Sequence, residues 1–144
     1  MEELRKALKI AFASEFAFYL KAHYFHWNVE GSDFAQYHEL FGNIYNEVYD
    51  TIDVFAENIR KAGGYTPGSF ERFSMLSKIE DETEVPDALT MVAELLADSD
   101  KMAQLFGIVY QLSEKFGEIG LSNYLAERQD AHRKHSWMLR ATLK

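Results

Sequence analysis

Apolar residues recur at steps of three and four along most of the chain, the spacing that places them on one face of an α-helix. The chain has only two prolines and eight glycines in 144 residues, so few positions interrupt this pattern. It predicts four long helices: from about Glu3 to Trp27, from a cap at Ser32 or Asp33 to about Ala62, from Pro86-Asp87 to about Gly117, and from Ser122 onward. We find no internal repeat and no domain boundary, and we expect residues 1–144 to form one all-α domain.

The connections between these helices are short, long and short. The turn at Asn28–Ser32 and the break at Gly117 and Gly120 are short. Residues 63–85 form a long segment that can hold a short helix from Ser69 to Leu76, capped by Ser69. A long connection can run back along a bundle and leave the second and third helices parallel, which is the ferritin-like arrangement with one crossover. A plain up-and-down bundle with a long loop fits the same lengths.

Composition and charge exclude several classes of protein. The absence of cysteine excludes a disulfide scaffold, an iron–sulfur cluster and a thiol nucleophile. No apolar run approaches the roughly 20 residues that span a bilayer, and the first residues lack the apolar core of a signal peptide, so we expect a cytoplasmic protein without a membrane partner. The net charge of −8 argues against a general electrostatic grip on nucleic acid.

The second predicted helix carries a polar stripe. His38, Gly42, Asn46, Asp53 and Glu57 follow one another at multiples of about one turn and therefore share a face. Asp53 and Glu57 are one turn apart and can present two carboxylates to one cation. A solvated helix face is the alternative for such a pair, but a histidine rather than a lysine or arginine shares this face.

Two histidine pairs have the same one-turn spacing. His23 and His26 lie in an aromatic segment at the end of the first helix, where either can be a packing residue or a solvent-facing one. His132 and His135 lie on the last helix, and we interpret them as structural. None of the five histidines follows a glutamate by three residues, so the Glu-x-x-His motif of di-iron sites within one bundle is missing.

A longer series of residues resembles a known family. The segment His26-Trp27-Asn28-Val29-Glu30-Gly31, then Phe34, His38-Glu39, and Asp53 with Glu57, resembles the Dps mini-ferritins of the ferritin-like superfamily. The segment Lys134-His135-Ser136-Trp137-Met138 resembles the signature of that family's last helix. The resemblance covers nearly the whole chain, in order.

This resemblance implies a ferritin-like four-helix bundle that assembles into a dodecameric shell. It also implies ferroxidase sites at the two-fold interfaces, where one chain contributes His26 and the partner chain contributes the carboxylates of Asp53 and Glu57. His38 then belongs to a weaker second metal position, and Trp27 lies near the iron, where we hypothesise that it intercepts oxidising equivalents. The implied function is oxidation of Fe(II) by hydrogen peroxide, or more slowly by dioxygen, with storage of ferric mineral and protection against oxidative stress.

Two departures leave alternatives open. Many family members have an aspartate where this chain has Gly42, so the second iron would be held by His38, water, and Asn46 or Glu39; a shell with weak or lost ferroxidase activity is one alternative. A DNA-binding nucleoid protein is another, but the helical pattern starts within a few residues and leaves no lysine-rich arm. Twelve chains at −8 would carry about −96, which opposes a polyanion. We therefore expect no tight DNA binding at physiological salt.

Overall fold

The computed structural model describes residues 1–144 and consists of five helices without strands. The helices are α1 (Glu2–Asn28), α2 (Phe34–Lys61), α3 (Phe70–Leu76), α4 (Ala88–Lys115) and α5 (Ile119–Thr142). The prediction of an all-α chain with four long helices and one short helix is confirmed. The short helix α3 has the predicted cap, since the Ser69 hydroxyl accepts a hydrogen bond from the Arg72 backbone N–H at 3.2 Å.

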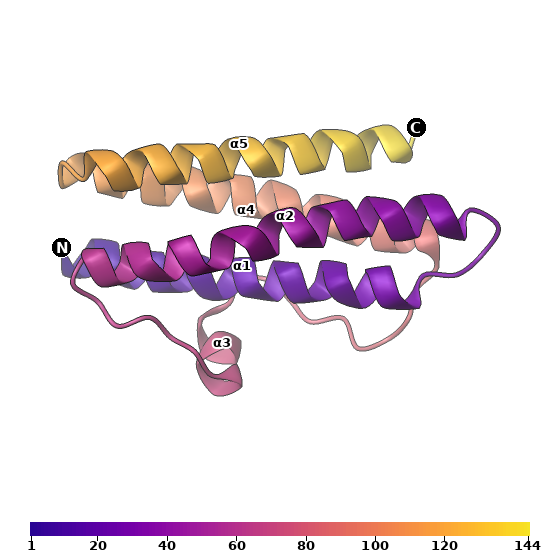
Figure 1. Ribbon diagram of the computed structural model, residues 1–144, viewed down its shortest axis with the longest axis horizontal. Helices are drawn as coiled ribbons and strands as arrows, with labels where there is room; N and C mark the ends of the chain where they lie inside the picture. Colours follow the sequence, from indigo (N-terminus) through magenta and orange to yellow (C-terminus); the bar gives the residue numbers. More distant parts are fainter.

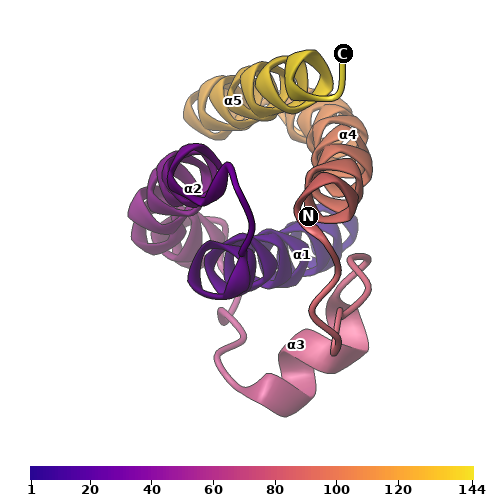
Figure 2. The same ribbon diagram turned by 90° about the vertical axis from the view of Figure 1, so that its right-hand side faces the viewer.

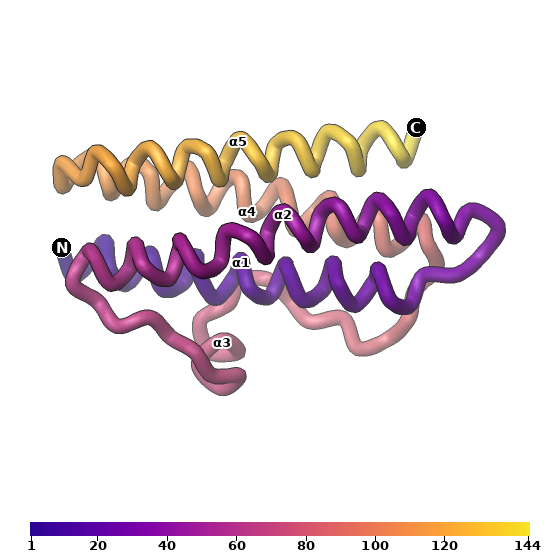
Figure 3. Tube along the Cα trace, in the orientation of Figure 1, coloured from indigo at the N-terminus to yellow at the C-terminus, as the bar shows by residue number.

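The long segment between α2 and α4 is a crossover. In Figure 1, α1 and α2 run in opposite directions, as do α4 and α5, whereas α2 and α4 run in the same direction. The trace in Figure 3 follows the crossover along the outside of α1, and Figure 2 shows α3 outside the ring of four long helices. This is the ferritin-like arrangement, and the plain up-and-down bundle is excluded.

The apolar stripes of the long helices meet in one continuous core. Its aromatic centre includes Phe12, Phe55 and Phe106; the first pair packs edge to face with ring centroids 5.4 Å apart, and the second pair lies 5.9 Å apart. Full burial of such a side chain contributes about 1.5–3 kcal/mol, so these stripes fix the rotation of each helix about its axis. Despite the stripes, no helix combines the length and apolar character that crossing a membrane requires.

One predicted capping hydrogen bond does not form, and one predicted helix start is wrong. Asp33 precedes α2, but its side chain makes no capping hydrogen bond, because its backbone (φ −105°, ψ 29°) is not in the extended conformation usual for a cap. The last helix begins at Ile119 rather than Ser122, and Gly120 lies inside its first turn. Gly117, at φ +70°, makes the break, while Ser122 is buried with its hydroxyl 2.6 Å from that of Ser113.

Candidate functional site

His26 and His38 form a reciprocal pair across the turn between α1 and α2. The Nδ1 atom of each lies 2.7 Å from the backbone carbonyl oxygen of the other, and the rings stack with centroids 3.7 Å apart. A carbonyl oxygen only accepts, so both Nδ1 atoms carry the hydrogen. In the neutral imidazoles, Nε2 therefore keeps its lone pair, the form in which histidine binds a transition metal.

Gly42 makes room for this pair. A Cβ atom at position 42 would lie 3.1 Å from both Cε1 and Nδ1 of His26, closer than carbon atoms normally pack. Glycine inside a helix costs about 1 kcal/mol relative to alanine, so its presence here calls for a local reason. The space that it leaves is where the His26 ring lies.

Asp53 and Glu57 lie on the exposed face of α2 and form no salt bridge within the chain. From His38 to Asp53 the helix advances about 22 Å at 1.5 Å per residue. A single chain therefore does not bring these carboxylates to the histidine pair. Nor does any group of three histidine, aspartate or glutamate side chains in the chain form a ready set of metal ligands.

The other histidine of the first pair, His23, is packed among aromatic rings. Its ring stacks on Tyr45 with centroids 3.8 Å apart and lies 4.0 Å from Trp27, and its Nδ1 is 3.0 Å from the Tyr19 hydroxyl. Burial, with a smaller contribution from His26, lowers the pKa of His23 and favours the neutral ring. Trp27 is 57% exposed, so the aromatic group around His23 reaches the surface.

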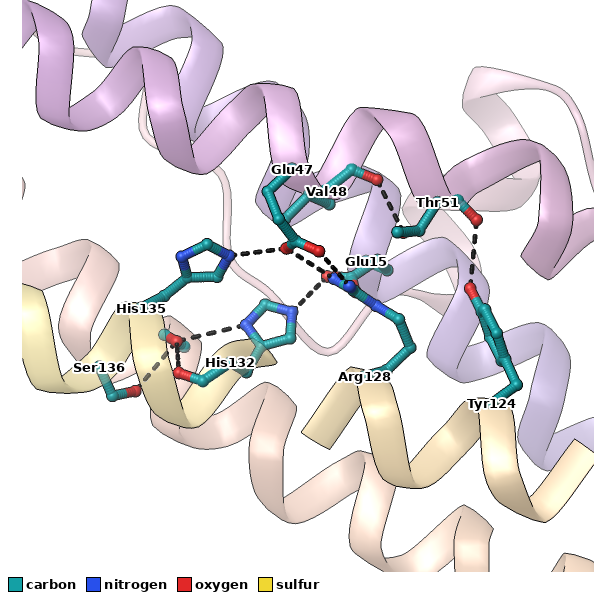
Figure 4. Close-up of polar contacts among 10 residues, drawn as sticks. Glu15, Glu47, Val48, Thr51, Tyr124, Arg128, His132, His135 and Ser136 are labelled. Carbon is teal, nitrogen blue, oxygen red and sulfur yellow. Dashed lines mark hydrogen bonds and ion pairs between the residues drawn. The ribbon is translucent and has the colours of Figure 1, made fainter. Parts of the chain in front are cut away.

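A second group of polar side chains lies inside the bundle (Figure 4). Arg128 on α5 points between two carboxylates: its Nη2 is 3.0 Å from Oε2 of Glu15 on α1 and 3.2 Å from Oε1 of Glu47 on α2. His132 donates from Nε2 to Glu15, and His135 donates from Nε2 to Glu47, each at 2.7 Å. We call these five residues the Arg128 cluster.

The charges of the Arg128 cluster balance one another. Burial by itself would raise the pKa of Glu15, but attraction to His132 and Arg128 outweighs it and lowers the pKa. Burial likewise opposes ionisation of Glu47, yet hydrogen bonds from His135 and Arg128 lower its pKa to about 2. No buried side-chain nitrogen or oxygen in the chain lacks a hydrogen-bond partner, so the cluster is fully satisfied.

These contacts tie α5 to the other helices. Arg128 and His135 reach Glu47 on α2, and the Tyr124 hydroxyl donates to the Thr51 carbonyl on α2 at 3.1 Å. On the α4 side, the Ser99 hydroxyl donates to the His132 backbone carbonyl at 2.9 Å. Polar side chains thus join α5 to α2 and α4 at the middle of the bundle.

Motifs and spacing alone do not single out Glu15, Glu47 or Arg128. A signal for two of them was present, because each interrupts an apolar stripe. Glu15 lies one turn from Ala11 and from Phe18, and Arg128 lies one turn from Leu125. A charged residue at a buried position of an amphipathic helix requires a partner from another helix.

Comparison with known proteins agrees with this fold. A model of the ferritin-like domain matches residues 5–144. The chain is 30% identical over 125 residues to DNA protection during starvation protein 2 of Bacillus anthracis, covering 87% of this chain and 86% of that protein. The chain belongs to the Dps branch of the ferritin-like family. Another relative of this Dps chain, 31% identical over 131 residues, is a low temperature-induced protein of Nostoc, with 90% of this chain and 73% of that one covered.

A solved structure gives the same assignment. The Dps protein from Vibrio cholerae O1, described as a member of a broad superfamily of ferritin-like diiron-carboxylate proteins, matches with a TM-score of 0.94 and 26% identity, covering 99% of this chain and 90% of that one. The family resemblance predicted from the sequence is thus confirmed. Membership supports iron storage of the mini-ferritin kind, iron binding, and activity of the ferroxidase type.

Proposed function

We propose that this Dps chain is a cytoplasmic mini-ferritin subunit that oxidises Fe(II) at sites shared between two copies and stores the ferric product in a dodecameric shell. The observation that carries the proposal is the division of the donors along α2. The His26–His38 pair lies at one level of the helix, and Asp53 and Glu57 lie about 22 Å away on its exposed side. The histidine pair does not have these two carboxylates nearby in the same chain, and the two carboxylates have no histidine ligand nearby.

A two-fold pair of chains supplies the missing half. If the axis passes near Asn46, the two α2 helices run antiparallel, and eight residues separate the axis from His38 on one side and from residue 54 on the other. His38 and its partner His26 of one copy then face Asp53 and Glu57 of the other, and the same holds in reverse. Asn46 and Tyr49 are exposed, as such an interface requires.

Exposed apolar surface between α1 and α3 supports a subunit contact close to Trp27, the residue that follows His26. A groove of about 700 Å³ between α1 and α3 is lined by Leu20, Tyr24, Trp27 and Phe73, among others. Leu20 and Trp27 are 43% and 57% exposed in the single chain. Continuous apolar surface of this kind is usually covered by another protein.

Imidazole and carboxylate donors suit Fe(II) and leave coordination positions open for an oxidant. Two Fe(II) ions each lose one electron, and together with two protons these electrons reduce one hydrogen peroxide to two waters, so no hydroxyl radical is released. The few protein ligands favour release of Fe(III) into the mineral. We further propose that Trp27, which follows His26 in the sequence and is exposed, intercepts oxidising equivalents that escape this reaction.

Gly42 limits the second iron position. It provides no ligand, and the Asn46 side chain donates its amide N–H to the Gly42 carbonyl at 2.9 Å. The second iron is therefore held by the Nε2 atom of His38 and by water, with Glu39 nearby on the same turn. We expect this iron to bind weakly, which makes a shell with slow ferroxidase activity the second candidate function.

The test is anaerobic mixing of Fe(II) with hydrogen peroxide while ferric absorbance is recorded. Asp53→Ala/Glu57→Ala is expected to lose the fast phase that the unaltered protein shows, with both proteins running as the same large assembly. The matched control is Glu127→Ala/Asp130→Ala, which removes two exposed carboxylates from α5 and should oxidise iron as fast as the parent. Equal slow rates in all three proteins would refute the proposed sites.

A further inference from the structure

The Arg128 cluster lies where four-helix bundles of this class build metal sites. Such sites use carboxylates and histidines that project inward from facing helices. Here Glu15 projects from α1, Glu47 from α2, and His132 and His135 from α5, all toward the middle of the bundle (Figure 4). These four residues offer two carboxylates and two imidazoles, a donor set that suits borderline divalent cations such as Zn²⁺ or Co²⁺.

A guanidinium group fills the centre of this donor set. One nitrogen of Arg128, Nη2, lies 3.0 Å from a Glu15 oxygen and 3.2 Å from a Glu47 oxygen, so the two carboxylates are within about 6 Å of each other. The imidazole Nε2 atoms each donate to one of these carboxylates at 2.7 Å, so each ring must move its hydrogen from Nε2 to Nδ1 before Nε2 can bind a cation. A cation in place of Nη2 would reach both carboxylates after shifts of about 1 Å, since Zn–O distances are about 2.0–2.2 Å.

Charge and burial explain why a cation must be present. Glu15 is completely buried and the Arg128 side chain is 3% exposed, so an ionised Glu15 needs a positive neighbour within the bundle. A guanidinium cannot lose its proton in a protein, and it satisfies both carboxylates with fixed geometry. No metal is needed for this, and no buried side-chain nitrogen or oxygen is left without a hydrogen-bond partner.

We propose that Arg128 is a built-in substitute for a divalent cation. It closes an intra-chain site formed by Glu15, Glu47, His132 and His135, and removing its guanidinium opens that site to Zn²⁺ or Co²⁺. In the native chain the bundle interior then takes up no metal. This inference concerns the inside of a single chain and does not depend on the sites proposed between copies.

The experiment is a Co²⁺ titration of Arg128→Ala in the Asp53→Ala/Glu57→Ala background, which lacks the proposed carboxylates between copies. We expect one Co²⁺ per chain, with the strong visible absorption of a four-coordinate ion, and a thermal midpoint that rises with Zn²⁺. The background protein and Arg128→Lys, which keeps a cation, should show neither. Adding His132→Gln and His135→Gln to Arg128→Ala should remove the absorption.

Loss of the Arg128 side chain also leaves buried carboxylates unpaired, so Arg128→Ala can fail to fold without metal. In that case we expect soluble Arg128→Ala protein to be recovered on refolding with Zn²⁺ and not with Mg²⁺, because Mg²⁺ prefers six oxygen ligands. Arg128→Gln, which can still donate to one carboxylate, provides a second test. A folded Arg128→Ala or Arg128→Gln without Co²⁺ absorption, or no Zn²⁺-dependent recovery of either, would overturn the proposal.

Discussion

His26 and His38 each direct Nδ1 at the backbone carbonyl oxygen of the other, at 2.7 Å in both directions. This exchange fixes both ring orientations and leaves both Nε2 atoms free. The ligands of the proposed iron site are thus held in place before iron arrives, by backbone groups at the turn between α1 and α2. Gly42 packs against the pair, since a Cβ atom at this position would lie only 3.1 Å from the His26 ring.

Replacing Gly42 by aspartate tests the role of that space. A Cβ would lie 3.1 Å from the His26 ring, so the ring must shift by a few tenths of an ångström, while the new carboxylate adds a ligand for the second iron. We expect Gly42→Asp to increase the initial rate of Fe(II) oxidation by peroxide several-fold. Gly42→Asn is the control, since it imposes the same crowding without the charge; equal rates in the two variants would contradict the prediction.

Glu15 should be among the costliest glutamates to remove. Glu15→Ala leaves Arg128 and His132 without their shared partner in the core, and breaking a buried ion pair costs about 3–5 kcal/mol. The control Glu114→Ala removes an exposed carboxylate and should change stability by less than about 0.5 kcal/mol. Thermal unfolding followed by circular dichroism compares the two, and similar midpoints would show that the cluster adds little stability.

Acid should weaken the fold through the same cluster. The hydrogen bonds from His135 and Arg128 overcome the effect of burial and lower the pKa of Glu47 from 4.5 to about 2, so its ionised form is favoured in the folded chain. Its contribution to stability is therefore complete above about pH 4.5 and is lost as the pH falls toward 2. Glu47→Gln should flatten the dependence of the unfolding midpoint on pH in this window, and an unchanged slope would count against this role for Glu47.

Trp27 provides a spectroscopic probe of the proposed site. The chain has two tryptophans, both largely exposed, so Trp137→Phe leaves Trp27 as the single tryptophan, which is excited selectively at wavelengths that tyrosine does not absorb. We expect its emission to shift to the blue when the shell assembles and to be quenched by Co²⁺. Adding Asp53→Ala/Glu57→Ala should remove the quenching but not the shift; quenching that persists would place the bound metal elsewhere.

Binding to DNA should be weak. A dodecamer of this chain carries about −96, and counterion release gives little affinity without a cluster of basic residues. Of the small basic group Arg5, Lys6 and Lys9, the first donates to the Ala62 carbonyl at 2.7 Å and pairs with Glu2 at 3.5 Å. A gel shift at physiological salt should show no retarded DNA, and a retarded band that weakens steeply with salt would show this expectation to be wrong.

The sequence alone determined the helices and their order. Spacing of three and four fixed which side of each helix is apolar, and the length of residues 63–85 made the crossover possible. The motif from His26 to Glu57 was enough for the family, because it is a string of residue types at set spacings. The choice between a crossover and an up-and-down bundle was open until the structure placed α4 parallel to α2.

Only the tertiary structure decided which side chains meet. Spacing along one helix says nothing about the register of a second helix packed against it, and that register puts Arg128 between Glu15 and Glu47. In the same way, the turn after α1 brings His26 onto His38, whereas the straight run of α2 carries Asp53 about 22 Å away. Periodicity assigns a residue to a face of its own helix, but its partner depends on how the helices pack.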